Sequence, residues 1–126
     1  MAQERKPLGL VLYVIETTGI PGRTAEAGNF MTDHLAHQDN LERRGIMFGA
    51  GALRTEGAEA GPPTQGLIII RADSFKDAKM IADSDPMHAN GLRTYTIRRW
   101  GLNEGTVNIR VNFQINVSNL NNLHIF

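Results

Sequence analysis

The spacing of apolar and polar residues divides most of the chain into strands and helices. Nearly continuous or alternating apolar sequence predicts four strands, at residues 8–16, 46–53, 66–71 and 92–100. Helical spacing predicts a helix that begins at Thr24 or Asn29, either of which can cap it, and ends near Gly45. A second helix begins at Asp73 or Ser74 and ends at Asp85, because proline follows.

The order of these elements is strand, helix, strand, strand, helix, strand. This order predicts an α+β, ferredoxin-like βαββαβ fold, an antiparallel sheet with both helices on one face. The chain of 126 residues is long enough for one domain, with its core at 8–100. The other sheet face is left open, so we expect a homodimer that packs face to face through its sheets.

Beyond the core, residues 107–117 alternate regularly between apolar and polar side chains. This pattern predicts an extra C-terminal strand within an extension at 105–126. The strand could pair with the edge of its own sheet or with another subunit, which would build a higher oligomer. Residues 119–126 are interpreted as a tail.

Composition excludes several classes of function. The 13 basic and 13 acidic side chains balance, so the chain lacks the positive field that nucleic-acid binding depends on. The absence of cysteine excludes disulfides, thiolate nucleophiles and iron–sulfur clusters. No apolar stretch approaches the ~20 residues that cross a bilayer, and the N-terminus lacks the pattern of an export signal. We therefore expect a cytoplasmic protein that binds neither membranes nor nucleic acid.

His34 is unusual because helical spacing places it among apolar residues. Phe30, Met31, Leu35 and Leu41 flank it on the predicted helix. A histidine there is either a satisfied core residue or a chemical group that faces a pocket.

Asp85 is a candidate partner for His34. It follows Ala78, Ile81 and Ala82 at helical spacings, so it projects toward the sheet from the second helix. A carboxylate that orients an imidazole and raises its basicity is a common acid–base device. The alternatives are a structural charge-assisted pair, or an aspartate that caps the turn into Pro86.

Other polar residues could complete a substrate site. His37 and His88 could line the mouth of a pocket, and Arg54 or Arg93 could bind an anionic substrate. We expect no metal, because no tight spacing of ligands demands one. We also expect no cofactor; the Gly49-Ala50-Gly51 segment lacks the later glycine of a dinucleotide-binding loop.

Two separated motifs resemble a known family. The first is Asp33-His34-Leu35-Ala36 followed by 44–51, and the second is the Asp85-Pro86 turn followed by Gly91 and a strand that ends at Trp100. The chain resembles the YciI-like (YCII-related) family over residues 8–100. The resemblance implies a dimeric α/β barrel with a His–Asp dyad, whose positions correspond to His34 and Asp85.

The resemblance also has departures. Where the family has Gly-Pro after the second strand, this chain has Gly51-Ala52, and where the family has an aromatic residue after Asp-Pro, this chain has Met87. The C-terminal extension is absent from typical short members of the family. The first two departures lie where they could reshape the pocket.

These observations favour a cofactor-independent enzyme, a lyase such as a dehydrohalogenase, or an isomerase, acting on a small ring compound. Family members include a dehydrochlorinase for chlorinated hydroxyquinols in aromatic degradation. His34 would be the general base or acid, and Asp85 would hold its tautomer. The alternatives are a non-catalytic ligand-binding or regulatory dimer with a pH-sensitive His34–Asp85 bridge, and a cofactor-free oxygenase.

Overall fold

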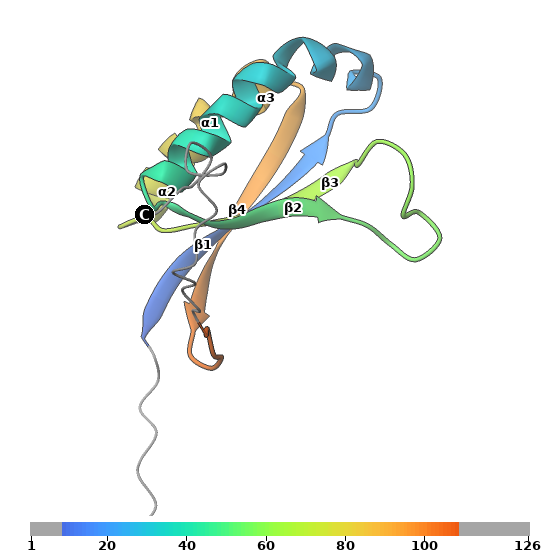
Figure 1. Ribbon diagram of the computed structural model, residues 1–126. Coiled ribbons are helices and arrows are strands. Elements are labelled where there is room, and N and C mark those ends of the chain that lie inside the picture. Colours follow the sequence, from blue (N-terminus) through green and yellow to red (C-terminus); the bar gives the residue numbers. More distant parts are fainter. Residues whose placement is uncertain (1–8, 109–126) are drawn as a thin grey trace, which may run out of the picture.

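A computed structural model describes residues 9–108 as a four-stranded antiparallel sheet with the helices on one face (Figure 1). The strands run in the spatial order β2-β3-β1-β4. They are β1 (Leu10–Gly19), β2 (Met47–Leu53), β3 (Gln65–Ile70) and β4 (Arg93–Leu102). This arrangement confirms the predicted α+β, ferredoxin-like fold. The strand predicted at 107–117 lies outside the described residues from 109 onward, as does the tail.

The predicted first helix consists of two parts, a 3-10 helix η1 (Thr24–Phe30) and the α-helix α1 (Met31–Arg43). Neither Thr24 nor Asn29 caps a helix, so that prediction is wrong. The N-cap positions are Arg23 and Phe30, and neither side chain makes a capping hydrogen bond. The C-terminal end is as predicted, because Gly45 takes a φ of 67° that ends the helix.

The second helical segment also has two parts, α2 (Phe75–Ser84) and the short α3 (Pro86–Ala89). Ser74 begins α2 by accepting a hydrogen bond from the Asp77 backbone N–H at 3.1 Å. Asp85 is extended, with a ψ of 126°, as a residue before proline prefers. Its carboxylate accepts the Met87 N–H at 2.9 Å, so Asp85 ends α2 and caps α3.

The core lies between the sheet and the helices. Tyr13 and Ile15 of β1 pack with Ile68 and Ile70 of β3, and the small residues Ala78 and Ala82 let α2 approach closely. Alternation along the strands places a second apolar set on the opposite face. Its members are Leu12, Val14, Leu67, Ile69 and Trp100, and the Glu16–Arg98 ion pair lies on the same face.

Candidate active site

Residues from α1 and from the α2–α3 junction meet at the sheet surface to form a histidine–aspartate pair. The Nδ1 atom of His34 lies 2.9 Å from Oδ1 and 3.0 Å from Oδ2 of Asp85. The Asp85 side chain is 4% exposed and that of His34 is 19% exposed. A buried carboxylate therefore touches a histidine that retains access to solvent.

This contact determines which ring nitrogen of His34 carries the proton. An ionised carboxylate can only accept hydrogen bonds, so Nδ1 must be the donor. In the neutral imidazole, Nε2 is then unprotonated and available as a base. Nε2 has no hydrogen-bond partner within residues 9–108.

Asp85 stays ionised despite its burial. Burial raises the pKa of its carboxyl, but the hydrogen bonds from His34 and from the Met87 N–H outweigh that effect. The pKa of Asp85 is consequently held below its usual value of 3.8. The charge needed to orient and stabilise a protonated His34 is thus present across the neutral pH range.

The face of α1 that packs against the sheet differs from the predicted one. Leu41 of the predicted stripe is buried, as expected, but Leu35 is 56% exposed and Met31 is 43% exposed, so their predicted burial beside His34 is wrong. Met31 still lines the cleft together with His34. The face toward the protein instead carries His34, His37, Gln38 and Leu41. These residues are three, four and seven positions apart and therefore share one side of α1, while Leu35 lies about 100° away around the helix axis. Compared with the predicted orientation, the helix is rotated about its axis.

His88 takes part in a second chain of hydrogen bonds. Its Nδ1 donates to the Ala82 carbonyl at 2.7 Å, and its Nε2 lies 2.8 Å from the Thr17 hydroxyl. The same hydroxyl accepts from Nε of Arg93 at 2.9 Å. Arg93, the first residue of β4, is in this way tied to His88 of α3 through Thr17 of β1.

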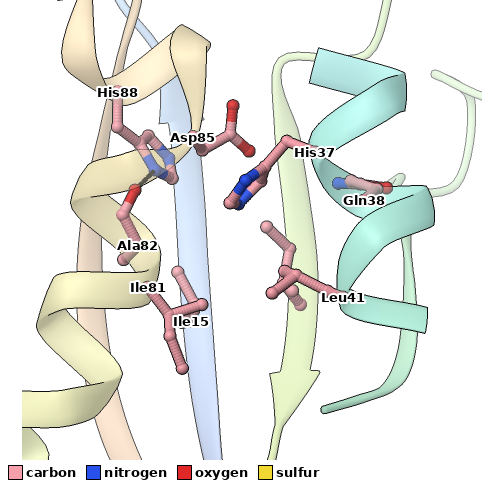
Figure 2. A pocket seen from close by; sticks show the side chains of 9 residues that line it. Ile15, His37, Gln38, Leu41, Ile81, Ala82, Asp85 and His88 are labelled. Carbon is pink, nitrogen blue, oxygen red and sulfur yellow. Dashed lines mark hydrogen bonds between the residues drawn. The ribbon is translucent and has the colours of Figure 1, made fainter. Parts of the chain in front are cut away.

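His37 faces a small cavity behind the pair, where Figure 2 shows it pointing toward Asp85 and His88. The cavity has a volume of about 10 Å³, close to the smallest space that holds one water molecule. Burial lowers the pKa of His37, although the charge of Asp85 opposes that effect. His37 is therefore held largely neutral beside the dyad.

In front of the pair lies an open cleft of about 960 Å³, between η1, the beginning of α1 and strands β2 and β3. His34, Asp85, His88 and Arg93 all contribute to its lining. Small residues of β2, Ala50 to Ala52, line the opposite wall. The cleft is within the usual size range for small-molecule sites, which is roughly 300–1,000 Å³.

The structure brings most of the predicted site residues together. His34, Asp85, His88 and Arg93 share the cleft, and His37 lies in the adjoining cavity. Arg54 lies elsewhere, beyond β2, where its guanidinium donates to the Ala58 and Gly61 carbonyls of the following loop.

Two site residues were not predicted from the sequence. Thr17 is 7% exposed and joins His88 to Arg93, and Gln38 lines both the cleft and the cavity. Thr17 continues the inward alternation of Tyr13 and Ile15, and Gln38 lies one helical turn after His34, so both positions carried a signal.

Within residues 9–108, no group of three or more His, Asp or Glu side chains is arranged to hold a metal ion. In the same part of the chain, no helix has the length and apolar character needed to cross a membrane.

Comparison with known proteins agrees with the motifs in the sequence. A family model for the YCII-related domain matches residues 11–101. The chain belongs to the YCII-related family. No curated protein matches its sequence.

A solved structure shares the YCII-related fold of this chain. It is 5-chloro-2-hydroxyhydroquinone dehydrochlorinase from Burkholderia phenoliruptrix AC1100, in complex with 2,5-dihydroxybenzoquinone. The TM-score is 0.61 at 22% sequence identity, and the match covers 71% of this chain and 92% of that one. The departing residues Ala52 and Met87 of this YCII-related chain both line the cleft.

Proposed function

We propose that the protein is a cofactor-independent enzyme, a lyase of the dehydrohalogenase type or an isomerase, that acts on a small ring compound in the cleft. One observation carries the proposal. The buried Asp85 carboxylate binds Nδ1 of His34, and His34 lines an open cleft with its Nε2 unpaired within the described residues. This is the arrangement of a general base with its orienting carboxylate.

In the elimination reaction, the chlorinated hydroxyquinol first tautomerises to a ketone, as a ring hydroxyl loses its proton and the carbon that bears the leaving group gains one. Nε2 of His34 then takes the proton of a second ring hydroxyl. The released electron pair forms a carbonyl at that hydroxyl, the adjacent ring double bond shifts toward the carbon that bears the leaving group, and the bond from that carbon to the leaving group breaks. The leaving group, such as chloride, departs with its electron pair, and protonated His34 then gives its proton to water. In an isomerisation, His34 instead takes a proton from one tetrahedral ring carbon and returns it to another carbon of the ring.

Two neighbouring charges support this chemistry. Asp85 stabilises the imidazolium that forms when His34 takes the proton. Arg93 supplies a positive charge in the same cleft for the carboxylate or enolate oxygen of the substrate. Arg93 rather than Arg54 is assigned this role, because Arg54 is bound to loop carbonyls outside the cleft.

The ring-compound substrate is supported by the structural neighbour, whose description names a chlorinated hydroxyhydroquinone and a dihydroxybenzoquinone. The proposed active form is a homodimer that packs through the open sheet face. Val14, Leu67 and Ile69 lie side by side there, and Trp100 is still 37% exposed. An apolar surface of this kind is typical of an interface.

A second candidate function is a non-catalytic dimer that binds a small ligand. It is favoured by the role of Asp85 as the cap of α3, which gives the His34–Asp85 contact a structural purpose. In that case, substitution of His34 should change stability and binding without removing any turnover.

The test is release of chloride from 5-chloro-2-hydroxyhydroquinone and related chlorinated hydroxyquinols. The proposal predicts turnover by the native protein and a loss of about 10²- to 10⁴-fold in kcat/KM for His34→Gln. Arg44→Gln is the control, because Arg44 bonds Asn40 at the C-terminal end of α1, outside the cleft. Turnover that survives His34→Gln would exclude the proposed mechanism, and binding without turnover would favour the second candidate.

A further inference from the structure

Arg93 differs from three surface arginines in how its charge is balanced. Arg23, Arg43 and Arg98 lie on the surface and pair with Glu26, Asp39 and Glu16. Arg93 is partly buried yet forms no salt bridge within residues 9–108. Burial lowers its pKa and the charge of Asp85 opposes this, but Asp85 is already bound by His34. A partly buried cation without an ion pair creates a place for an anion.

The guanidinium of Arg93 is held by neutral oxygen atoms. Its Nε donates to the Thr17 hydroxyl at 2.9 Å, and its Nη2 lies 3.3 Å from the carbonyl oxygens of Thr17 and Thr64. The remaining nitrogen, Nη1, makes no hydrogen bond to residues 9–108. Its N–H groups are therefore available to a ligand in the cleft.

The Thr17 hydroxyl has only one arrangement that satisfies both of its neighbours. The Ala82 carbonyl can only accept, so Nδ1 of His88 carries the proton and the neutral ring's Nε2 must accept. The Thr17 O–H then donates to His88, and its lone pairs are left for Nε of Arg93. His88 thus orients the hydroxyl, and the hydroxyl orients the guanidinium.

We propose that Thr17, oriented by His88, is a positioning residue that holds Arg93 for anion recognition and makes the cleft select anionic over neutral ring compounds. The ligand class is a planar ring that carries a delocalised oxyanion, a carboxylate or an enolate. His88 acts through Thr17 and does not bind the substrate, because both of its ring nitrogens are occupied. The inference takes the ring from the proposed function but does not require the reaction.

The test compares the affinities of the native protein and its variants for two ligands by titration calorimetry at neutral pH. The ligands are 2,5-dihydroxybenzoquinone, which ionises, and 2,5-dimethoxybenzoquinone, which has the same ring and no acidic hydroxyl. Arg93→Gln should weaken the affinity for the anion about 10- to 100-fold and leave the affinity for the neutral ligand unchanged. Thr17→Val should weaken the affinity for the anion about 2- to 10-fold. Thr17→Ser, which keeps the hydroxyl, should have the affinity of the native protein.

Equal losses for both ligands, or a Thr17→Ser variant as weak as Thr17→Val, would overturn the inference. So would a native protein that does not bind the anion at millimolar concentration. If Thr17→Val does not fold, Arg93→Lys carries the test, because lysine keeps the charge without the planar fork that Thr17 holds. Its selectivity should fall, and unchanged selectivity would contradict the role of Thr17.

The same measurements separate this inference from the proposed reaction. His34→Gln should keep the preference for the anion, since Arg93 and Thr17 are intact, while it loses chloride release. If anion selectivity depends on Arg93 but turnover does not depend on His34, the reaction is wrong and the anion site stands.

Discussion

The Nδ1 atom of His34 lies within 3.0 Å of both carboxylate oxygens of Asp85, and one of those oxygens also accepts the Met87 N–H. The helix cap and the dyad therefore use the same carboxylate. Because Pro86 makes the backbone of Asp85 extended, the start of α3 fixes the position of the carboxylate before any ligand arrives. The dyad is preorganised by local backbone structure.

The first prediction concerns the tautomer of His34. We expect nuclear magnetic resonance of the ring nitrogens to show neutral His34 protonated at Nδ1, because a carboxylate can only accept a hydrogen bond. In Asp85→Asn the side-chain amide can donate to Nδ1, so the population should shift toward protonation at Nε2. His34→Gln assigns the signal. A native His34 with the Nε2-protonated form dominant would contradict the geometry.

Acid stability should depend on Asp85. Its pKa is lowered in the folded protein, so its contribution is complete above the unfolded value of about 3.8 and is lost as pH falls through the folded value. The free energy of unfolding in urea should thus fall more steeply on acidification for the native protein than for Asp85→Asn. The two should differ in slope below about pH 4. Parallel curves would show that Asp85 is not stabilised as an anion.

His37 should add a second pH dependence at higher pH. Burial lowers its pKa below 6.5, so the unfolded chain binds a proton more readily than the folded protein. The contribution of neutral His37 to the free energy of unfolding is complete above the unfolded-state pKa of 6.5 and is lost as pH falls from 6.5 toward the lower pKa of the folded protein. His37→Gln should remove this loss, as measured by urea unfolding. Leu35→Gln, at an exposed position of the same helix, should keep it.

If the proposed dimer forms, charged substitutions in two apolar regions should have different effects on the oligomeric state. Ile69→Glu places a charge on the open sheet face and should reduce the mass measured by light scattering from dimer to monomer. Leu35→Glu is the matched control, because Leu35 is 56% exposed on α1, on the helical side of the sheet. A native protein that is monomeric at micromolar concentration, or a dimer that only Leu35→Glu disrupts, would exclude this interface.

The strands and the fold were predictable because their pattern is local. The alternation in 92–100 determines the two faces of a strand, and the apolar run in 66–71 indicates a buried strand, in both cases without knowledge of the rest of the chain. The end of the second helix at Asp85 was predicted on the same principle, since proline disfavours helical geometry in the residue before it. The role of Asp85 as a cap of the turn into Pro86 was predicted as one of the alternatives, but the helix α3 that follows was not, because four residues are too few to show a helical period.

The rotation of α1 could not be predicted from the helix alone. Leu35 and Met31 are apolar, so spacing favours burying them, yet both are exposed, while tertiary packing partly buries His34 and His37. His34 is stable in this position because it forms a hydrogen bond with Asp85, which lies outside α1. Asp85 is 51 residues away from His34 in sequence, and periodicity contains no such information.

The arginines illustrate the same limit. Arg54 and Arg93 are equivalent in a sequence, since each follows or begins a strand. Their roles differ because Thr17 and Thr64 hold Arg93 in the cleft, while loop carbonyls hold Arg54 outside it. The two arginines can be distinguished only from the pairing of β1 with β4 and from the position of the loop before β3.

The central claim is that Asp85 makes His34 a general base, and one comparison tests it most directly. Asp85→Asn keeps the cap of α3, because asparagine also accepts at an N-cap, but removes the charge and favours the wrong tautomer. Asp83→Asn in α2 is the control, because Asp83 accepts a hydrogen bond from the partly buried Tyr95 outside the cleft. For chloride release from a chlorinated hydroxyquinol, we predict a loss of about 10²- to 10⁴-fold in kcat/KM for Asp85→Asn and native activity for Asp83→Asn. Equal activity of the two variants would contradict the claim.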